Sequence, residues 1–157
     1  MAYVTAITDR DQADIETGNS KAYFNVADWE RIYGNTQDVN TEVFKDFAAF
    51  TSLSTPTTAT IPTAANLNTL LANIEWMRLG IATNFPALVA SEPLFVEIKD
   101  DWTAGQSNTA PTFLAVNSWE KVLDILHGLD PLDYPGYREL ESESNRLLEN
   151  GDTRILG

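Results

Sequence analysis

Cysteine is missing from this chain, and histidine occurs only once, at position 127. A chain without cysteine forms no disulfide bond, no thiolate metal site, no thiol nucleophile and no iron–sulfur cluster. One histidine alone also supplies too few nitrogen ligands for a transition-metal centre. The sequence therefore predicts no metal and no cofactor. We expect His127, which directly precedes Gly128, to lie at a helix C-terminus, where exposed carbonyl groups stabilise a cation.

Basic residues are scarce, since ten lysines and arginines stand against 23 acidic residues and give a formal net charge of −13. Phosphate backbones and anionic lipid surfaces repel such a protein, so we expect neither a nucleic-acid partner nor membrane insertion. Apolar runs of about 18 residues, which a transmembrane helix needs, are also missing. Residues 1–7 lack the basic region and the long apolar stretch of a secretory signal, so we expect no export through the general pathway.

Nucleotide-binding motifs are absent as well, because the sequence contains neither G-x-G-x-x-G nor G-x-x-x-x-G-K-[ST]. Residues 100–111 begin like an EF-hand loop, but Trp102 and Ala104 occupy positions that must donate oxygen, and Pro111 replaces the final glutamate. Carboxylate pairs of the kind that hydrolyse glycosides arise by chance among so many acids. The sequence therefore predicts a protein that is not an enzyme, and an irregular calcium site stays open as an alternative.

Aromatic residues are plentiful, with four tryptophans, five tyrosines and seven phenylalanines among 157 residues. Together with a hydrophobic share of 43% they indicate a folded protein rather than a disordered one. A chain of this length usually forms one domain with a substantial buried core. We therefore predict a single domain over residues 1–157.

One helix-start phrase occurs twice. Residues 62–77 (PTAANLNTLLANIEWM) and 111–126 (PTFLAVNSWEKVLDIL) both begin with Pro-Thr and carry an asparagine six residues after the proline. Apolar residues then fall at equivalent positions, which pair as Leu67 with Val116, Leu70 with Trp119, Ile74 with Leu123 and Met77 with Leu126. A shorter echo at residues 25–32 repeats the Asn and the Trp-Glu step of residues 117–122. This repetition indicates a protein built from repeated packing units rather than around reactive side chains.

Apolar spacing and capping residues predict a mainly α fold, a compact bundle of five or six short helices with long ordered loops and at most a short strand or hairpin. Thr8 and Asn25 are the expected N-caps of the first two helices. The expected helices cover about residues 9–17, 26–33, 39–50, 62–79, 111–127 and 137–149.

Glycines and one apolar run predict the boundaries between these helices. We expect five glycines to end helices in the left-handed conformation, namely Gly18, Gly34, Gly80, Gly128 and Gly151. Pro86 and Pro93 break the stretch after Gly80. Residues 94–98 are the best strand candidate, with Leu94, Val96 and Ile98 on one face.

Two segments are predicted to be exposed arms. Residues 1–8 are apolar and β-leaning, and residues 51–60 (TSLSTPTTAT) are rich in threonine. We expect both to lie on neighbouring subunits, with contacts from Tyr3, Thr55, Thr57 and Thr58. Trp102 lies in a polar loop, whereas the other tryptophans fall in helical apolar patterns, so we expect Trp102 at a buried edge or a subunit contact.

Three further phrases stand at residues 8–14 (TDRDQAD), 22–32 (AYFNVADWERI) and 112–123 (TFLAVNSWEKVL). They resemble the phrases "TDRT-x-AD", "AYN-x-x-D-x-N-R-V-E" and "TY-x-x-A-N-x-x-E-x-I-L" of structural proteins from tail and baseplate modules of phages and prophages of Gram-positive bacteria. A "DW…PT" phrase and an "N-x-x-x-I" helix of those proteins look like Asp101-Trp102, Pro62-Thr63 and Asn73-Ile74. The order differs here, because the Asp-Trp pair follows the first Pro-Thr helix.

The resemblance implies a non-enzymatic structural component of a phage tail or baseplate, assembled in the host cytoplasm and located in the virion. Its partners would be other tail or baseplate proteins and further copies of itself, as in a homo-oligomer. The alternative is a host-receptor or carbohydrate-binding module at the tail tip, in which Trp102 stacks on a sugar. A third hypothesis, an acidic mimic of nucleic acid, is disfavoured because the charges are scattered along the chain.

Overall fold

The computed structural model describes residues 2–22, 24–44, 50–53, 62–93, 95–99, 102–103 and 111–129. Within these residues the chain is mainly helical, as predicted, and contains no β-strand. The elements are, in order, α1 (Gln12–Thr17), the 3-10 helix η1 (Ser20–Ala22), α2 (Val26–Glu42), α3 (Ala64–Asn84), α4 (Pro86–Ser91) and α5 (Phe113–His127). The helix expected at 137–149 lies outside the described residues.

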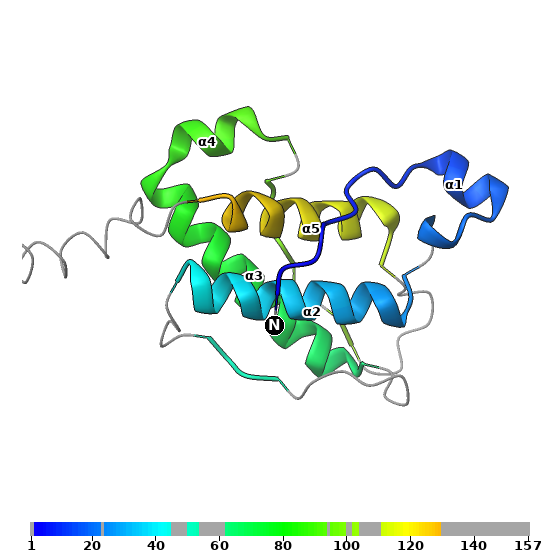
Figure 1. Cartoon of the computed structure of the whole chain (residues 1–157), viewed down its shortest axis with the longest axis horizontal. Coiled ribbons are helices and arrows are strands. Elements are labelled where there is room, and N and C mark those ends of the chain that lie inside the picture. Colours follow the sequence, from blue (N-terminus) through cyan, green and yellow to red (C-terminus); the bar gives the residue numbers. More distant parts are fainter. Residues whose placement is uncertain are drawn as a thin grey trace, which may run out of the picture.

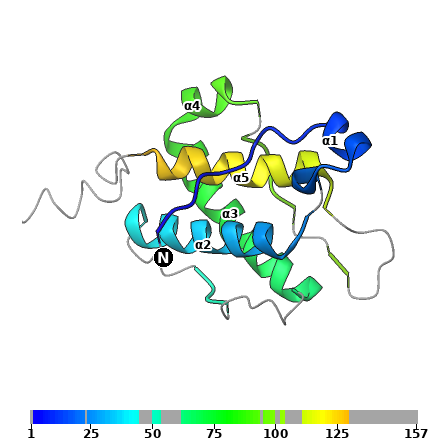
Figure 2. The same cartoon turned by 45° about the vertical axis from the view of Figure 1, so that its right-hand side comes forward.

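Three helices form the body of the described structure. Helices α2 and α5 lie side by side and run in the same direction, and α3 crosses both at an angle (Figures 1 and 2). Helix α4 packs against α3, whereas α1 extends from one end of the body and packs mainly against η1. The chain therefore divides into a three-helix body and a smaller N-terminal part that projects from it.

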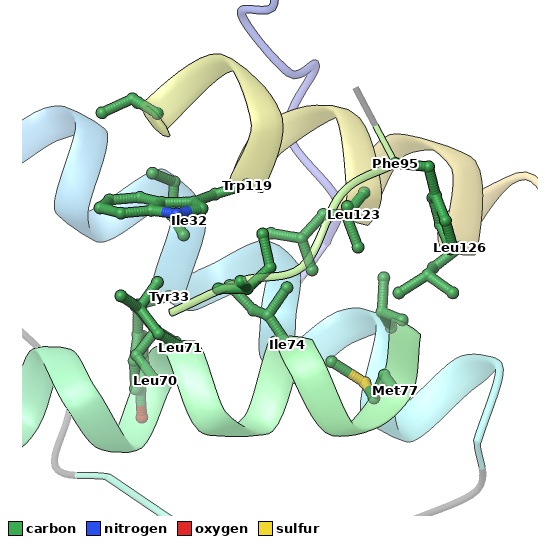
Figure 3. Close-up of a cluster of buried hydrophobic side chains, with 14 of the residues drawn as sticks. Ile32, Tyr33, Leu70, Leu71, Ile74, Met77, Phe95, Trp119, Leu123 and Leu126 are labelled. Carbon is green, nitrogen blue, oxygen red and sulfur yellow. The ribbon is translucent and has the colours of Figure 1, made fainter. Parts of the chain in front are cut away.

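The core lies where α2, α3 and α5 meet (Figure 3). All eight apolar residues paired by the repeated phrase are buried there, so the predicted equivalence of the two phrases is confirmed. Ile32 and Tyr33 contribute the matching face of α2. Burial of each such side chain stabilises the fold by about 1.5–3 kcal/mol, so this seam holds the three helices together.

Polar side chains cap the helices, and of the two N-caps that the sequence predicts, Thr8 and Asn25, only Asn25 is confirmed. Asn25 caps α2, while Thr63 and Thr112 cap α3 and α5 by accepting the N–H group three residues ahead. The expected N-cap at Thr8 is wrong, because α1 begins three residues later at Asp11. The Asp11 carboxylate accepts the N–H of Asp14 and the Asp14 carboxylate accepts the N–H of Asp11, so these two residues form a reciprocal capping box.

The predictions of helix ends from glycine are confirmed only in part. Gly18 does end α1 in the left-handed conformation, with φ of 68°. Gly128 ends α5, but its φ of −74° is right-handed. The predictions for Gly34 and Gly80 are wrong, because α2 and α3 continue through them. Burial of Tyr33 and Asn35 beside Gly34, and of Met77 and Ile81 near Gly80, offsets the propensity cost of about 1 kcal/mol for each glycine. Gly151 lies outside the described residues.

The strand expected at residues 94–98 is also wrong. Residues 95–99 form no strand, and their buried side chains are Phe95 and Ile98, while Val96 is exposed. The Ile98 N–H donates to the Glu75 carboxylate at 2.9 Å instead of to a neighbouring strand. The guanidinium of Arg78 lies 5.8 Å from the centre of the Phe95 ring. A side chain of α3 therefore takes the place of a strand partner.

Candidate interaction site

Residues 2–10 lie across α2 and α5 without regular secondary structure and are called the N-terminal segment below (Figures 1 and 2). Asn35 of α2 holds Val4 of this segment, because its Oδ1 accepts the Val4 N–H at 2.8 Å and its Nδ2 donates to the Val4 carbonyl at 2.7 Å. Asn117 of α5 holds Arg10 in the same way, with Nδ2 donating to the Arg10 carbonyl at 2.8 Å. Both asparagines therefore pair with backbone as a neighbouring strand would.

The same arrangement occurs at two further places, and we call all four asparagine clamps. Asn68 holds the N–H and carbonyl of Trp102 at 3.0 and 2.8 Å. Asn73 holds those of Thr51 at 3.0 and 2.8 Å. Asn68 and Asn117 are the two asparagines of the repeated phrase, so they share both their position in the phrase and the way they bind backbone. Each clamp satisfies an N–H and a carbonyl in a segment without strand partners.

A cluster of four charged side chains lies beneath the N-terminal segment: Arg10, Asp28, Arg31 and Glu120. Arg10 Nη2 contacts Asp28 Oδ1 at 2.8 Å and Glu120 Oε1 at 2.7 Å. Arg31 donates to Glu120 at 2.9 and 2.6 Å and also pairs with Asp28. The Glu120 side chain is fully enclosed, with 0% of its surface exposed. We call this group the ion cluster, and it balances two positive against two negative charges.

Two backbone N–H groups also donate hydrogen bonds to the carboxylates of the ion cluster. Glu120 Oε2 accepts the Ile7 N–H at 2.7 Å, and Asp28 Oδ2 accepts the Asn25 N–H at 3.0 Å as part of the cap of α2. Although burial opposes its charge, the bonds to Glu120 and Asp28 raise the pKa of Arg31 above its ordinary value. Every charge in the cluster is therefore paired with an opposite charge of the same chain.

The tip of the N-terminal segment rests on the end of α5. The ring of Tyr3 stacks on His127 with centroids 3.8 Å apart, and the Tyr3 hydroxyl donates to Asp124 at 3.4 Å. Burial, together with the negative charge of Asp124, raises the pKa of Tyr3. His127 lies in the last turn of α5, as the sequence predicts, and its Nε2 lies 3.8 Å from the Asp38 carboxylate. The segment is thus anchored at both ends.

Residues 9–22 close on themselves before the chain enters α2. The Lys21 ammonium pairs with Asp9 and Asp14, both at 3.2 Å, and the Lys21 carbonyl accepts from Arg10 Nε at 2.9 Å. Burial alone would raise the pKa of Asp14, but the Asp11 N–H and Lys21 lower it below its ordinary value. We call residues 2–22, which join this closed loop to the N-terminal segment, the N-terminal unit.

Two of the predicted contact residues, Tyr3 and Trp102, are partly buried against their own chain. Tyr3 lies on the body of its own chain, as described above. Trp102 is half-buried against the core, and its backbone is held by Asn68. The predictions for Thr55, Thr57 and Thr58 lie outside the described residues. The Asn73 clamp and a bond from the Tyr33 hydroxyl to the Leu53 carbonyl hold residues 51–53.

Sequence reasoning missed most of this site. Asn35 and Asn73 fall inside long helices, where asparagine is an unfavourable residue, and this is the signal that could have identified them. Each is buried although it is polar. A buried asparagine in a helix needs partners for both halves of its amide, and a non-helical backbone supplies them.

A scan of protein-family models, a search of curated proteins and a search of solved structures found no match to this chain. Among the described residues, no group of three or more histidine, cysteine, aspartate and glutamate side chains is arranged to hold a metal ion. No described helix combines the length and the apolar character needed to cross a bilayer.

Proposed function

We propose that this protein is a non-enzymatic structural subunit of a phage tail or baseplate, which assembles through repeated contacts with copies of itself and with other tail proteins. The proposed fold is a single compact bundle. The proposed location is the virion, after assembly in the host cytoplasm.

One observation carries the proposal: the residues that give the chain its resemblance to tail proteins meet in one place. The three phrases at residues 8–14, 22–32 and 112–123 lie far apart in the sequence. Their phrase-matching polar residues nevertheless form one cap, one clamp and the ion cluster, through Arg10, Asn25, Asp28, Arg31, Asn117 and Glu120. This convergence supports the proposal, because residues that matter for one spatial framework also carry the resemblance.

The chemistry of this framework favours a structural role. Its charged groups are engaged with one another, and its amides are engaged with backbone. A catalytic group must come within hydrogen-bond reach of a substrate, and the buried positions of Arg10, Asp28 and Glu120 do not favour such contact. A subunit that is repeated many times needs long connecting segments held in fixed positions, which the asparagine clamps provide.

The half-buried Trp102 does not favour the alternative of a sugar-binding module. A sugar stacks on an exposed aromatic face, whereas this ring packs against the core. A glycan array would test the alternative directly, since binding that is lost in Trp102→Ala and retained in the matched variant Trp29→Phe would support it.

Particles from the strain that carries the gene test the proposal. Tails purified on a density gradient should contain the protein in fixed proportion to the other tail proteins, and immunogold labelling should place it at one defined position. Light scattering of the purified protein should give a mass of more than one chain. The proposal fails if intact tails lack the protein, whatever its state of association in solution.

A further inference from the structure

We propose that the N-terminal unit, residues 2–22, is exchanged between copies of this chain, so that in the assembled state the body of each copy holds the N-terminal segment of another. The partner is a second copy of the chain, and the site is the surface of α2 and α5 beneath that segment. This inference rests on the proposed function, because it names the contact through which subunits associate.

The N-terminal unit is built to move as one piece. Lys21 and Arg10 close its loop internally, through bonds that do not involve the body. Helix α1 packs mainly against η1, and the unit joins α2 through the short stretch between Ala22 and Asn25. Short connections of this kind favour exchange of an element between identical chains.

The body recognises the N-terminal segment mainly by its backbone. Asn35 and Asn117 each bind an N–H and a carbonyl, and Glu120 binds a third N–H, that of Ile7. None of these contacts depends on whether the segment belongs to the same chain. Exchange therefore replaces every bond by an identical one, and the concentration of chains in an assembly decides between the two states.

The ion cluster makes the surface of α2 and α5 unfavourable when no N-terminal segment is bound there. Without Arg10, two buried carboxylates, those of Asp28 and Glu120, would share only Arg31. An uncompensated negative charge would then remain in a site where Glu120 is completely shielded from water. Each copy must therefore receive a segment for the one it gives, which leads to closed pairs or rings rather than to chains with vacant sites.

Cross-linking tests the exchange directly, and the absence of cysteine from the natural sequence makes it specific. Tyr3→Cys and His127→Cys chains are mixed in equal amounts, unfolded in urea, refolded together at high concentration and treated with a short bis-maleimide. Tyr3 and His127 stack at 3.8 Å, so the two cysteines meet wherever the segment lies on α5. We expect a covalent dimer that contains one chain of each kind.

Glu92 and Lys121 provide the matched control, because their side chains pair at 3.8 Å and both belong to the body. Separate Glu92→Cys and Lys121→Cys chains should give no mixed dimer under the same treatment. The inference is overturned if the Tyr3→Cys and His127→Cys mixture behaves like this control while the doubly substituted chain links only within itself. If light scattering then still shows an oligomer, the exchange alone has failed and the proposed function stands.

Complementation provides a second measurement that leaves Tyr3 and His127 intact. Arg10→Ala damages the segment and Asn117→Ala damages the site, so neither chain alone can form the complete contact. Reciprocal exchange in a mixed pair gives one contact with an intact segment and an intact site, and one contact that carries both defects. A refolded mixture should therefore show a new thermal transition several degrees above those of the separate variants. A mixture that melts as the sum of its parts contradicts the inference.

Discussion

Asn117 holds Arg10, a residue 107 positions earlier in the chain, with both halves of its side-chain amide. The amide nitrogen donates to the Arg10 carbonyl at 2.8 Å, and the amide oxygen accepts the Arg10 N–H at 3.3 Å. A single side chain on a helix thus pairs with the N–H and the carbonyl of an extended segment, as a neighbouring strand does in a sheet. The same relationship at Asn35, Asn68 and Asn73 makes it the recurring device of this fold.

Replacing Asn73 should reveal what one clamp contributes. Asn73→Ala leaves the N–H and carbonyl of Thr51 without their partner, and we expect a loss of about 1–3 kcal/mol in the free energy of unfolding. Asn73→Asp should cost at least as much at neutral pH, because a carboxylate cannot donate to the Thr51 carbonyl. Urea denaturation measures both, with Asn66→Ala on the same helix as the control. Equal stability of Asn73→Ala and this control would refute the role of the clamp.

Removing Arg10 should destabilise the protein strongly. Arg10→Ala leaves Asp28 and Glu120 with a single guanidinium, and breaking a buried ion pair in this way costs about 3–5 kcal/mol. Arg10→Lys retains the charge but cannot bond both carboxylates in the same geometry, so it should fall between wild type and alanine. Urea unfolding should show almost no change for Lys121→Ala, whose ion pairs are half-exposed. A loss below about 1 kcal/mol for Arg10→Ala would contradict the expected cost of breaking this cluster.

Alkaline pH should weaken the anchor at Tyr3. The pKa of Tyr3 is raised by burial and by Asp124, so the neutral phenol is favoured in the folded state. The stabilisation is fully present below the unfolded pKa of about 10 and is lost as the pH rises above it. Since the ring is half-buried and water screens Asp124, the loss should be less than about 1 kcal/mol.

Tyr3→Phe provides the comparison for this effect. Unfolding free energies of wild type and variant, measured in urea at pH 9 and pH 11, should show a larger decline for wild type, because the variant has no phenol to ionise. Parallel declines of the two proteins would mean that Asp124 does not influence Tyr3.

Two glycines at helix ends should respond oppositely to alanine. Gly18 has φ of 68°, where a side chain is strained even though no atom lies within 4 Å of the added Cβ, so Gly18→Ala should cost about 1 kcal/mol. Gly128 is right-handed, and its nearest neighbour to an added Cβ is a carbonyl oxygen at 3.5 Å. Gly128→Ala should therefore be neutral or stabilise by up to about 1 kcal/mol. Thermal unfolding of the Gly18→Ala and Gly128→Ala variants measures this difference. Equal melting temperatures of the two variants would contradict the expected effect of backbone conformation.

The sequence predicts the parts of the fold that depend on local periodicity. Leu70 and Trp119, or Ile74 and Leu123, are buried as the repeated phrase requires, because helical spacing directs them to one face. The same reasoning fails at residues 94–98. The alternation of apolar residues there predicts a strand, but the Ile98 N–H donates to the Glu75 carboxylate instead of to a neighbouring strand. Periodicity indicates which face of an element is apolar, but it does not indicate which side chain will bind a backbone group.

The ion cluster was beyond the reach of sequence reasoning for a related reason. Asn25 is predicted and found as the N-cap of α2, and Asp28 completes its capping box, but nothing near Asp28 in the chain identifies Arg10 or Glu120 as its partners. Glu120 looks like one of many surface acids and is in fact enclosed. The partial echo between residues 25–32 and 117–122 was misleading in detail, since Asn25 caps a helix while Asn117 clamps a backbone.

Glu120 also has a consequence for synthesis. Its bonds reach back to Ile7, 113 residues earlier, and to Arg31, 89 residues earlier. Translation proceeds from the N-terminus to the C-terminus, so residues 2–10 leave the ribosome before α5 has been made and cannot form these bonds until it has. The N-terminal segment is therefore made well before its binding site, and during that interval it is available to any other nascent copy nearby.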